Sequence, residues 1–211
     1  IAHSRQNGVC ATLNEAVAVA TGELLAQVAG DDAWMPDRLT CHRDAFHEPT
    51  VGVVYSDVEV IDEDGRQVAE SYIRDILGID KPPTGSIFDR LAASNPIPAM
   101  GATVRLSALR SIGGFDESLM FEDWDAWLRL AAAGWSFAYV PAVVASYRRG
   151  LAGSLTAEAF MKPSAERAVS VARLLLRQAG RSKPGDVAMR PAVRAALREA
   201  YAMRHPVAVR L

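Results

Sequence analysis

The stretch of sequence that is most informative about the fold is VAGDDAWMPDRL, residues 28–39, where an apolar segment ends on two adjacent carboxylates, Asp31 and Asp32. We expect residues 24–29 to form a short buried strand, with the two acids at its carboxyl end, where open α/β sheets bind ligands. Neighbouring carboxylates repel each other unless a cation or water lies between them. Hard divalent ions bind carboxylates together with substrate phosphate oxygens. The pair therefore predicts metal-assisted chemistry on a phosphate-containing substrate.

A simpler interpretation is that Asp31 and Asp32 are ordinary loop acids, because aspartate is common in turns. Pro36 suits the first position of the following helix, which puts Met35 rather than either aspartate at the helix cap. Short motifs often match by chance. The acidic pair therefore needs support from a second motif.

The composition indicates one main globular domain. The chain has 211 residues, of which 50% are hydrophobic, enough to bury a sizeable core. The two cysteines, Cys10 and Cys41, have neither metal-type spacing nor the pattern of a disulfide framework, which fits a reducing compartment. No apolar run approaches the ~18 residues of a membrane span. We therefore expect a cytoplasmic protein, and no nucleic-acid partner.

The net charge of −2 hides an asymmetry along the chain. Residues 1–161 contain 12 Lys and Arg against 22 Asp and Glu, whereas residues 162–211 contain 11 against 3. The acidic part carries the candidate site, and the basic part is typical of an appended helical segment. We expect a catalytic domain over residues 1–156 and a basic C-terminal helical segment over residues 157–211.

The basic segment has arginines at helical spacing, namely Arg190, Arg194 and Arg198, with Arg173 and Arg177 one helix earlier. Basic amphipathic helices bind anionic membrane surfaces. We therefore expect peripheral contact with the inner face of the cell membrane. The alternatives are that these helices dock on the acidic part of the chain or present solvated charge.

Hydrophobic periodicity predicts that helices and strands alternate. The expected helices cover residues 8–21, 36–46, 87–93 and 121–133, and the expected strands cover residues 24–29, 51–61 and 102–105. Ser107 is expected to cap a further short helix, which Gly113 and Gly114 end. Strands alternating with helices indicate an α/β layered fold.

The second motif is Phe121-Glu-Asp-Trp-Asp125, which opens the helix that is expected to end at Ala133. The buried stripe of this helix is formed by Trp124, Trp127, Leu128 and Ala131. Asp123 lies in the first turn beside that stripe, so it can be partly enclosed and act as a general base on a hydroxyl group. The alternative is that the acids only interact favourably with the N-terminal end of the helix dipole.

Taken in order, these motifs resemble the family 2 glycosyltransferases of the GT-A fold. The order is GDD-x-x-x-P, a VVYSD strand, GGFDE, EDWDAWLR and a terminal YRR, between residues 5 and 154. The resemblance implies a GT-A (Rossmann-like) mixed sheet flanked by helices. It also implies inverting transfer of a sugar from a nucleotide-diphosphate sugar to the hydroxyl of a saccharide or lipid-linked acceptor, as in polysaccharide biosynthesis.

The resemblance also implies roles for particular residues. Asp31 and Asp32 match the DxD-type motif, with Asp32 as the ligand of Mn²⁺ or Mg²⁺ and Asp31 as support for the donor. Asp123 matches the base that deprotonates the acceptor. Arg148 matches a basic residue that meets the diphosphate, and residues 113–116 match the loop bordering the acceptor side.

The chain departs from the family pattern at its start. The family begins with a strand-helix-strand-helix unit that holds the nucleotide base, whereas Ile1-Ala2-His3 matches the end of the third strand. At about 30 residues for each βαβ unit, we expect some 60–70 residues to be missing, so that residues 1–156 form a partial GT-A domain. Two other hypotheses remain open: a non-catalytic interaction protein on a degenerate transferase fold, and a metal-dependent nucleotidyltransferase.

Overall fold

The centre of the computed structural model, which describes residues 7–150 and 164–203, is a mixed six-stranded sheet. The strand order is β1-β5-β3-β6-β2, and β4 pairs with β3. The strands are β1 (Leu24–Ala26), β2 (Ala33–Trp34), β3 (Val51–Ile61), β4 (Gln67–Ala69), β5 (Ala102–Arg105) and β6 (Ser136–Arg148). β3 and β6 are parallel, and the other pairs are antiparallel.

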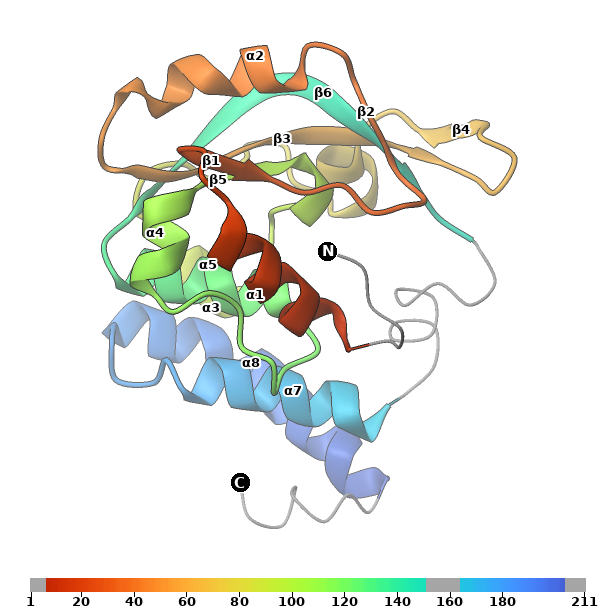
Figure 1. Ribbon diagram of the computed structural model, residues 1–211. Coiled ribbons are helices and arrows are strands. Elements are labelled where there is room, and N and C mark those ends of the chain that lie inside the picture. The colour runs from red at the N-terminus through yellow and green to blue at the C-terminus, as the bar shows by residue number, and fades with distance from the viewer. Residues whose placement is uncertain (1–6, 151–163, 204–211) are drawn as a thin grey trace.

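Helices cover both faces of this sheet (Figure 1). One face carries α1 (Val9–Val19), α3 (Phe88–Ala93), α4 (Leu106–Ser111) and α5 (Glu122–Ala132). The other face carries α2 (Arg38–Arg43) and the 3₁₀ turn η1 (Asp44–His47). The short helical turns η2 (Tyr72–Ile76) and η3 (Ala99–Gly101) lie between strands in the sequence, and α7 (Ala165–Leu176) and α8 (Lys183–Ala202) form a further layer.

β3 is buried along almost its whole length, and its alternating side chains serve two cores. Val53 and Tyr55 join the main core, which the sheet forms with α3, α4 and α5. Val54 belongs to a second cluster with Phe46 of η1. This alternation follows from the two-residue period of a strand. Burial on both faces explains why the sequence from Val51 to Val54 is entirely apolar or Gly.

The predicted α/β layering is present, but three predictions about single elements are wrong. Pro36 does not begin the helix after the acidic loop and Met35 is not its cap, because α2 begins at Arg38 with Asp37 before it. Ser107 does not cap α4, because this helix already begins at Leu106 and has no side-chain cap. The buried strand predicted over residues 24–29 ends at Ala26 and is only partly buried, because β1 lies at the edge of the sheet and pairs only with β5. The sequence pattern also does not reveal β6, the 13-residue strand that contains Pro141.

α7 and α8 dock on the rest of the chain through apolar side chains. Leu174 and Leu175 of α7 and Met189 and Val193 of α8 are buried in the main core. Across the described ranges, no helix is long and apolar enough to cross a membrane. The predicted boundary between residues 156 and 157 lies outside the described residues, as does the strand end expected at residues 1–3.

Candidate active site

The acidic loop, residues 27–32, connects β1 to β2. β2 pairs with β6, where Ala33 lies opposite Ser146, and the Met35 N–H donates to the Val144 carbonyl at 3.0 Å. Asp31 and Asp32 directly precede β2. The pairing therefore brings them to the end of β6, whose last residue is Arg148.

Trp34 binds the start of the acidic loop and packs against Arg38. Its Nε1–H donates to the Gln27 carbonyl at 3.3 Å, and the Arg38 guanidinium carbon lies 4.4 Å from the centroid of its ring. Arg38 is fully buried and also donates to the carbonyls of Met100 and Ala102. Burial lowers the pKa of Arg38 to about 10, so it stays charged at neutral pH. The loop therefore rests on a rigid support that reaches η3 and β5.

Asp32 is tied directly to β6, because the backbone N–H of Arg148 donates to Asp32 Oδ1 at 2.9 Å. The side chains of Asp31 and Asp32 are both partly buried. Burial raises the pKa of Asp32, the Arg148 N–H opposes this rise, and the charge of Asp31 adds to it. A carboxylate whose charge is disfavoured in this way gains strongly from a nearby cation.

The guanidinium of Arg148 binds carbonyl oxygens of two loops. Its Nε–H donates to the Asp31 carbonyl at 3.0 Å, and Nη1 donates to the carbonyls of Asp62 and Glu63 at 2.9 and 3.2 Å. The structure thus brings Asp31, Asp32 and Arg148 together. The contact with Asp31 engages its backbone carbonyl oxygen, which leaves its carboxylate available to another ligand.

The donor set of this loop fits a hard divalent ion that arrives with a phosphate. In the part of the chain that the structure describes, no group of three or more His, Cys, Asp or Glu side chains could hold a metal ion. Mg²⁺ characteristically takes one or two carboxylates and completes its shell with water and substrate phosphates. Asp31 and Asp32 could therefore hold such an ion together with a diphosphate.

Asp123 lies in the first turn of α5 and is held by two hydrogen-bond donors. The backbone N–H of Trp124 donates to Oδ1 at 2.6 Å, and the side-chain amide of Asn95 donates to Oδ2 at 2.9 Å. Burial raises the pKa of Asp123, and both donors oppose the rise. Burial and the neighbouring Asp123 raise the pKa of Glu122 to about 7. The site therefore holds a carboxylate of increased basicity, as a general base requires.

Asp125 of the same motif has a different role. It is buried and accepts a hydrogen bond from Arg129 Nε at 2.6 Å. Arg129 also donates to the carbonyls of Ile112 and Gly114, at 2.7 and 2.8 Å. Asp125 and Arg129 therefore fix the Gly-Gly turn, while Asp123 points elsewhere.

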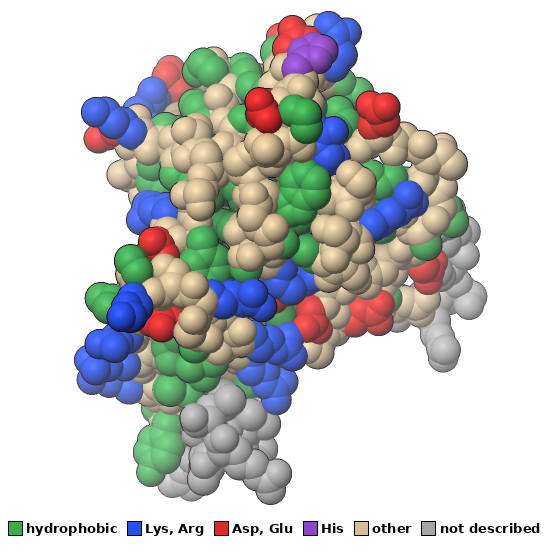
Figure 2. All heavy atoms as spheres, turned by 90° about the vertical axis from the view of Figure 1, so that its left-hand side faces the viewer, with side chains coloured by type: hydrophobic (Ala, Val, Ile, Leu, Met, Phe, Trp, Pro, Cys, Tyr) green, Lys and Arg blue, Asp and Glu red, His purple; other side chains and the backbone are tan. Residues whose placement is uncertain are grey.

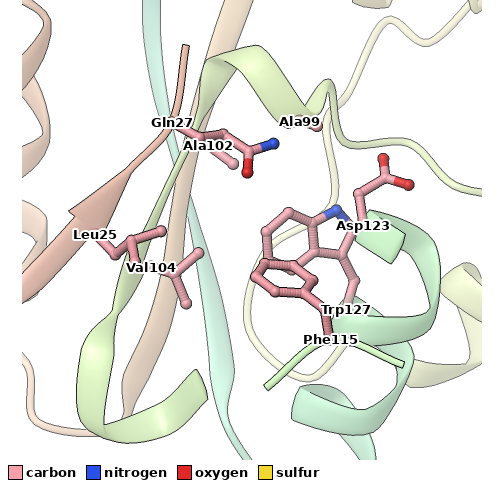
Figure 3. Close-up of a pocket in the computed structure, with 8 residues that line it drawn as sticks. All are labelled: Leu25, Gln27, Ala99, Ala102, Val104, Phe115, Asp123 and Trp127. Atoms are coloured by element: carbon pink, nitrogen blue, oxygen red, sulfur yellow. The ribbon is translucent and has the colours of Figure 1, made fainter. Parts of the chain in front are cut away.

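A small pocket lies between Asp123 and the sheet (Figure 3). Its volume is about 10 Å³, roughly the room of one water molecule. Figure 3 shows Asp123 at one side, the rings of Phe115 and Trp127 next to it, and strand residues across from them. The lining residues are Leu25, Gln27, Ala99, Ala102, Val104, Phe115, Asp123 and Trp127. Asp123 thus borders a largely apolar hollow, in keeping with the rise in its pKa that burial causes.

The loop predicted to border the acceptor is attached to α1. Gly113 and Gly114 both have positive φ, near +80°, and a Cβ on Gly114 would lie 2.5 Å from Asn14 Oδ1. Asn14 accepts from the Phe115 N–H at 2.8 Å and donates to the Phe115 carbonyl at 2.9 Å. The second glycine is therefore needed both for its backbone conformation and for the close approach of Asn14.

Tyr72 of η2 packs against the end of β6. Its ring meets that of Tyr147 edge to face, with 5.7 Å between the centroids. Burial and then the neighbouring Tyr147 raise the pKa of Tyr72; the charge of Arg149 lowers it and that of Asp123 raises it. Tyr72 therefore lies within electrostatic reach both of Asp123 and of Arg149, the residue that follows β6.

Comparison with known proteins identifies the family. Residues 29–162, more than half of the chain, match the sequence profile of Glycosyl transferase family group 2. The chain belongs to this family. The match includes Asp31, Asp32, Asp123 and Arg148. No curated protein sequence matches the chain.

Two solved structures show that this glycosyltransferase-family chain has the GT-A fold that was predicted. One is the mannosyltransferase PcManGT from Pyrobaculum calidifontis in complex with GDP-Man and Mn²⁺, with 18% identity and a TM-score of 0.54. The alignment covers 98% of this chain and 58% of the mannosyltransferase chain. The other is TarS 1-349 from S. aureus in complex with UDP-GlcNAc, with 15% identity and a TM-score of 0.57. The alignment covers 92% of this chain and 53% of the TarS chain. This chain therefore spans a little over half the length of each of the two structures.

The family motifs do not point to two residues that the structure places at the site. Asn95 binds the carboxylate of Asp123, and Asn14 binds the acceptor-side loop. Each contact joins segments far apart in the sequence, so no local spacing indicates it. The one local signal is that Asn95 precedes Pro96, a pair of residues that is typical of turns.

Proposed function

We propose that this chain carries the catalytic residues of an inverting glycosyltransferase. In the proposed reaction, a sugar passes from a nucleotide-diphosphate sugar to a hydroxyl group of a saccharide or lipid-linked acceptor, as in polysaccharide biosynthesis. The observation that carries the proposal is the arrangement of the acids in two groups. Asp31 and Asp32 lie beside the end of β6, while Asp123 is held separately at the start of α5.

On the donor side, Asp32 is the proposed ligand of Mn²⁺ or Mg²⁺, and Asp31 the proposed support for the donor. A bound divalent ion would neutralise charge on the departing nucleoside diphosphate. The mannosyltransferase relative binds GDP-Man and Mn²⁺, which supports this assignment. Arg148 keeps both acids in place through Asp32 and the Asp31 carbonyl, and its fixed positive charge favours a diphosphate nearby.

On the acceptor side, Asp123 accepts the proton of the attacking hydroxyl as its oxygen bonds to the anomeric carbon. The bond from this carbon to the diphosphate oxygen breaks in the same displacement, which inverts the configuration. Burial raises the pKa of Asp123 and so strengthens it as a base, while Trp124 and Asn95 keep it ionised and oriented. Such general-base catalysis contributes about 10²–10⁴-fold in rate.

Release of nucleoside diphosphate from a panel of nucleotide sugars tests the donor side. We expect release to require Mn²⁺ or Mg²⁺, to stop with excess chelator, and to be lost in Asp32→Ala. Asp64→Asn is the matched control, because Asp64 is an exposed acid in the turn after β3, and it should keep the wild-type rate. Release that is unaffected by the chelator would overturn the metal assignment.

We also propose that α8 attaches the protein peripherally to the inner, cytoplasmic face of the cell membrane. Arg190, Arg194 and Arg198 are all exposed on α8, and so are Val187 and Tyr201, at 59% and 72%. Figure 2 shows Lys and Arg side chains on the lower part of the molecule, where the C-terminal helices lie. Each cation near an anionic surface contributes about 1 kcal/mol.

Co-sedimentation with vesicles containing anionic lipid tests this attachment. Replacing Arg190, Arg194 and Arg198 by Gln should reduce binding at low salt, and added salt should reduce the binding of the wild type. Replacing Arg43 and Arg66, two exposed arginines elsewhere, is the control and should change binding little. Equal and salt-insensitive binding of all three proteins would mean that the arginines of α8 serve only solubility.

A further inference from the structure

Asn95 lies in a short loop after α3 that has little conformational freedom. The loop, Ser94-Asn-Pro-Ile-Pro98, contains two prolines, each of which fixes its own φ and restricts the residue before it. Pro96, Ile97 and Pro98 are buried. The loop therefore presents Asn95 to α5 from a rigid support.

The orientation of the Asn95 amide follows from its hydrogen bonds. Its Oδ1 accepts from the backbone N–H of Ile97 at 3.1 Å, which only an acceptor atom can do. The NH₂ group must then be the one that faces Asp123 Oδ2, at 2.9 Å. Because the Ile97 N–H fixes this orientation, Asn95 always offers a donor and never an acceptor to the carboxylate.

This donor acts on the charge of Asp123. A hydrogen bond to the ionised form of a carboxylate lowers its pKa, whereas burial raises it. The titratable groups that face Asp123 are Glu122 beside it, whose pKa burial and Asp123 raise to about 7, and Tyr72 of η2. Asn95 and the Trp124 N–H each oppose the effect of burial on the pKa of Asp123. They also occupy one position on each carboxylate oxygen, and a carboxylate has about four such positions. The remaining positions are available to an acceptor hydroxyl.

We propose that Asn95 is a positioning residue for the catalytic base, which keeps Asp123 ionised and oriented toward the acceptor. The inference rests on the proposed function, because it assigns a role relative to the base. Asn95 itself takes no proton and touches no reacting atom. Its hydrogen bond opposes the rise in the pKa of Asp123 that burial causes. Asp123 can thus remain ionised at neutral pH and still be a stronger base than an exposed aspartate.

The titration of Asp123 tests this inference without any enzymatic assay. The ¹³C chemical shift of the Asp123 side-chain carboxyl is followed against pH in the wild type, Asn95→Ala and Asn95→Asp, with assignment from Asp123→Asn. We expect the pKa of Asp123 to rise by on the order of one unit in Asn95→Ala, because a charge-assisted hydrogen bond is lost. It should rise further in Asn95→Asp, where a second acid replaces the donor. Unchanged titration in both variants would overturn the inference.

Activity against pH then separates this inference from the proposed function. In Asn95→Ala, the acidic limb of kcat/KM should move to higher pH, and the rate should recover on raising the pH, while KM for the donor stays within about two-fold. Asn14→Ala is the matched control, because Asn14 fixes a loop through Phe115 rather than through Asp123. It should lower Tm without moving the limb. If Asp123→Asn retains full activity, the proposed base is wrong; if it is inactive and the limb of Asn95→Ala does not move, only the role of Asn95 is wrong.

Discussion

The acidic loop and the start of α5 hold their aspartates by opposite means. Asp32 depends on Arg148, a residue 116 positions away, which meets it only because β2 pairs with β6. Asp123 depends on the next residue, Trp124, and on Asn95 in a proline-rich loop. The acids proposed to hold the donor are thus positioned by the register of the sheet, and the proposed base by the first turn of its own helix together with a loop 28 residues earlier.

The two regions also differ in the charges around them. An arginine lies beside Asp31 and Asp32, whereas the contacts of Asp123 are to neutral donors and to the acidic Glu122. A metal and diphosphate bring their own charges, so the donor side benefits from a fixed cation. A base gives up its charge during the reaction, and neutral donors hold the ionised carboxylate less strongly than a nearby cation would, so that Asp123 can still accept a proton. This difference predicts distinct effects for changes in the two regions.

The largest effect is expected on the side of the base. Asp123→Asn keeps the shape of the side chain and removes its ability to accept a proton, so kcat should fall by about 10²–10⁴-fold. Donor affinity should change little, because Asp31 and Asp32 are untouched. Steady-state kinetics with the preferred nucleotide sugar measures both quantities.

Asp125→Asn is the control for this change and tests the assignment within the motif. It breaks a buried pair with Arg129 and so should lower Tm, because Arg129 also holds the Gly-Gly turn. Activity per folded molecule should fall less than in Asp123→Asn. If Asp125→Asn stopped turnover and Asp123→Asn did not, the base would be wrongly assigned.

A smaller effect is expected from the clamp on the donor side. Arg148→Met removes the guanidinium hydrogen bonds to the carbonyls of Asp31, Asp62 and Glu63 but keeps the backbone N–H that binds Asp32. We expect the affinity for metal and nucleotide to fall about ten-fold, since each such bond contributes ~1 kcal/mol and part of the loop stays in place. Arg148→Lys should recover only part of it, because one ammonium cannot reproduce the fork of donors. Calorimetric titration with Mn²⁺ and nucleoside diphosphate measures this, and wild-type affinity in Arg148→Met would contradict the clamp.

The comparison also shows which parts of the site a sequence can reveal. The acidic pair, the EDWD motif and the α/β alternation are local patterns of charge and periodicity, and the family match includes both motifs. The sequence does not reveal that β6 holds the acidic loop through β2, because Pro141 interrupts the strand pattern. It also does not reveal that Asn95 meets Asp123, because 28 residues separate them. The metal, the base and Arg148 remain functional predictions, whereas their placement is a property of the fold.

The last expected effect is on stability rather than on turnover or affinity, and it tests the contacts that hold α2, the helix after the acidic loop, on the sheet. His42 of α2 is fully buried, with Nδ1 2.8 Å from Thr103 Oγ1 and Nε2 2.9 Å from Ser56 Oγ. The hydroxyl of Ser56 donates to the Val140 carbonyl, so its oxygen must accept from His42 Nε2–H. His42 Nδ1 therefore accepts from the Thr103 hydroxyl. Both nitrogens of the neutral His42 ring therefore have hydrogen-bond partners. Through them α2, the helix that follows the acidic loop, is bound to β3 and β5.

Protonation of His42 should lower the stability of the protein, because the charged ring can no longer accept the hydrogen bond from Thr103. Burial, with a smaller contribution from Arg38, lowers the pKa of His42 from 6.5 to about 4. Between these values the unfolded chain binds a proton that the folded chain does not, so the stabilisation present above pH 6.5 is lost as the pH falls toward 4. The loss should be about 2 kcal/mol between pH 7 and pH 5 and about 3 kcal/mol by pH 4. Urea denaturation at pH 7 and pH 5 measures it, with His42→Gln as control, since glutamine does not titrate and its stability should fall less over this range. An equal fall in both proteins would mean that other groups cause the acid sensitivity and that the attachment of α2 to the sheet does not depend on a neutral His42.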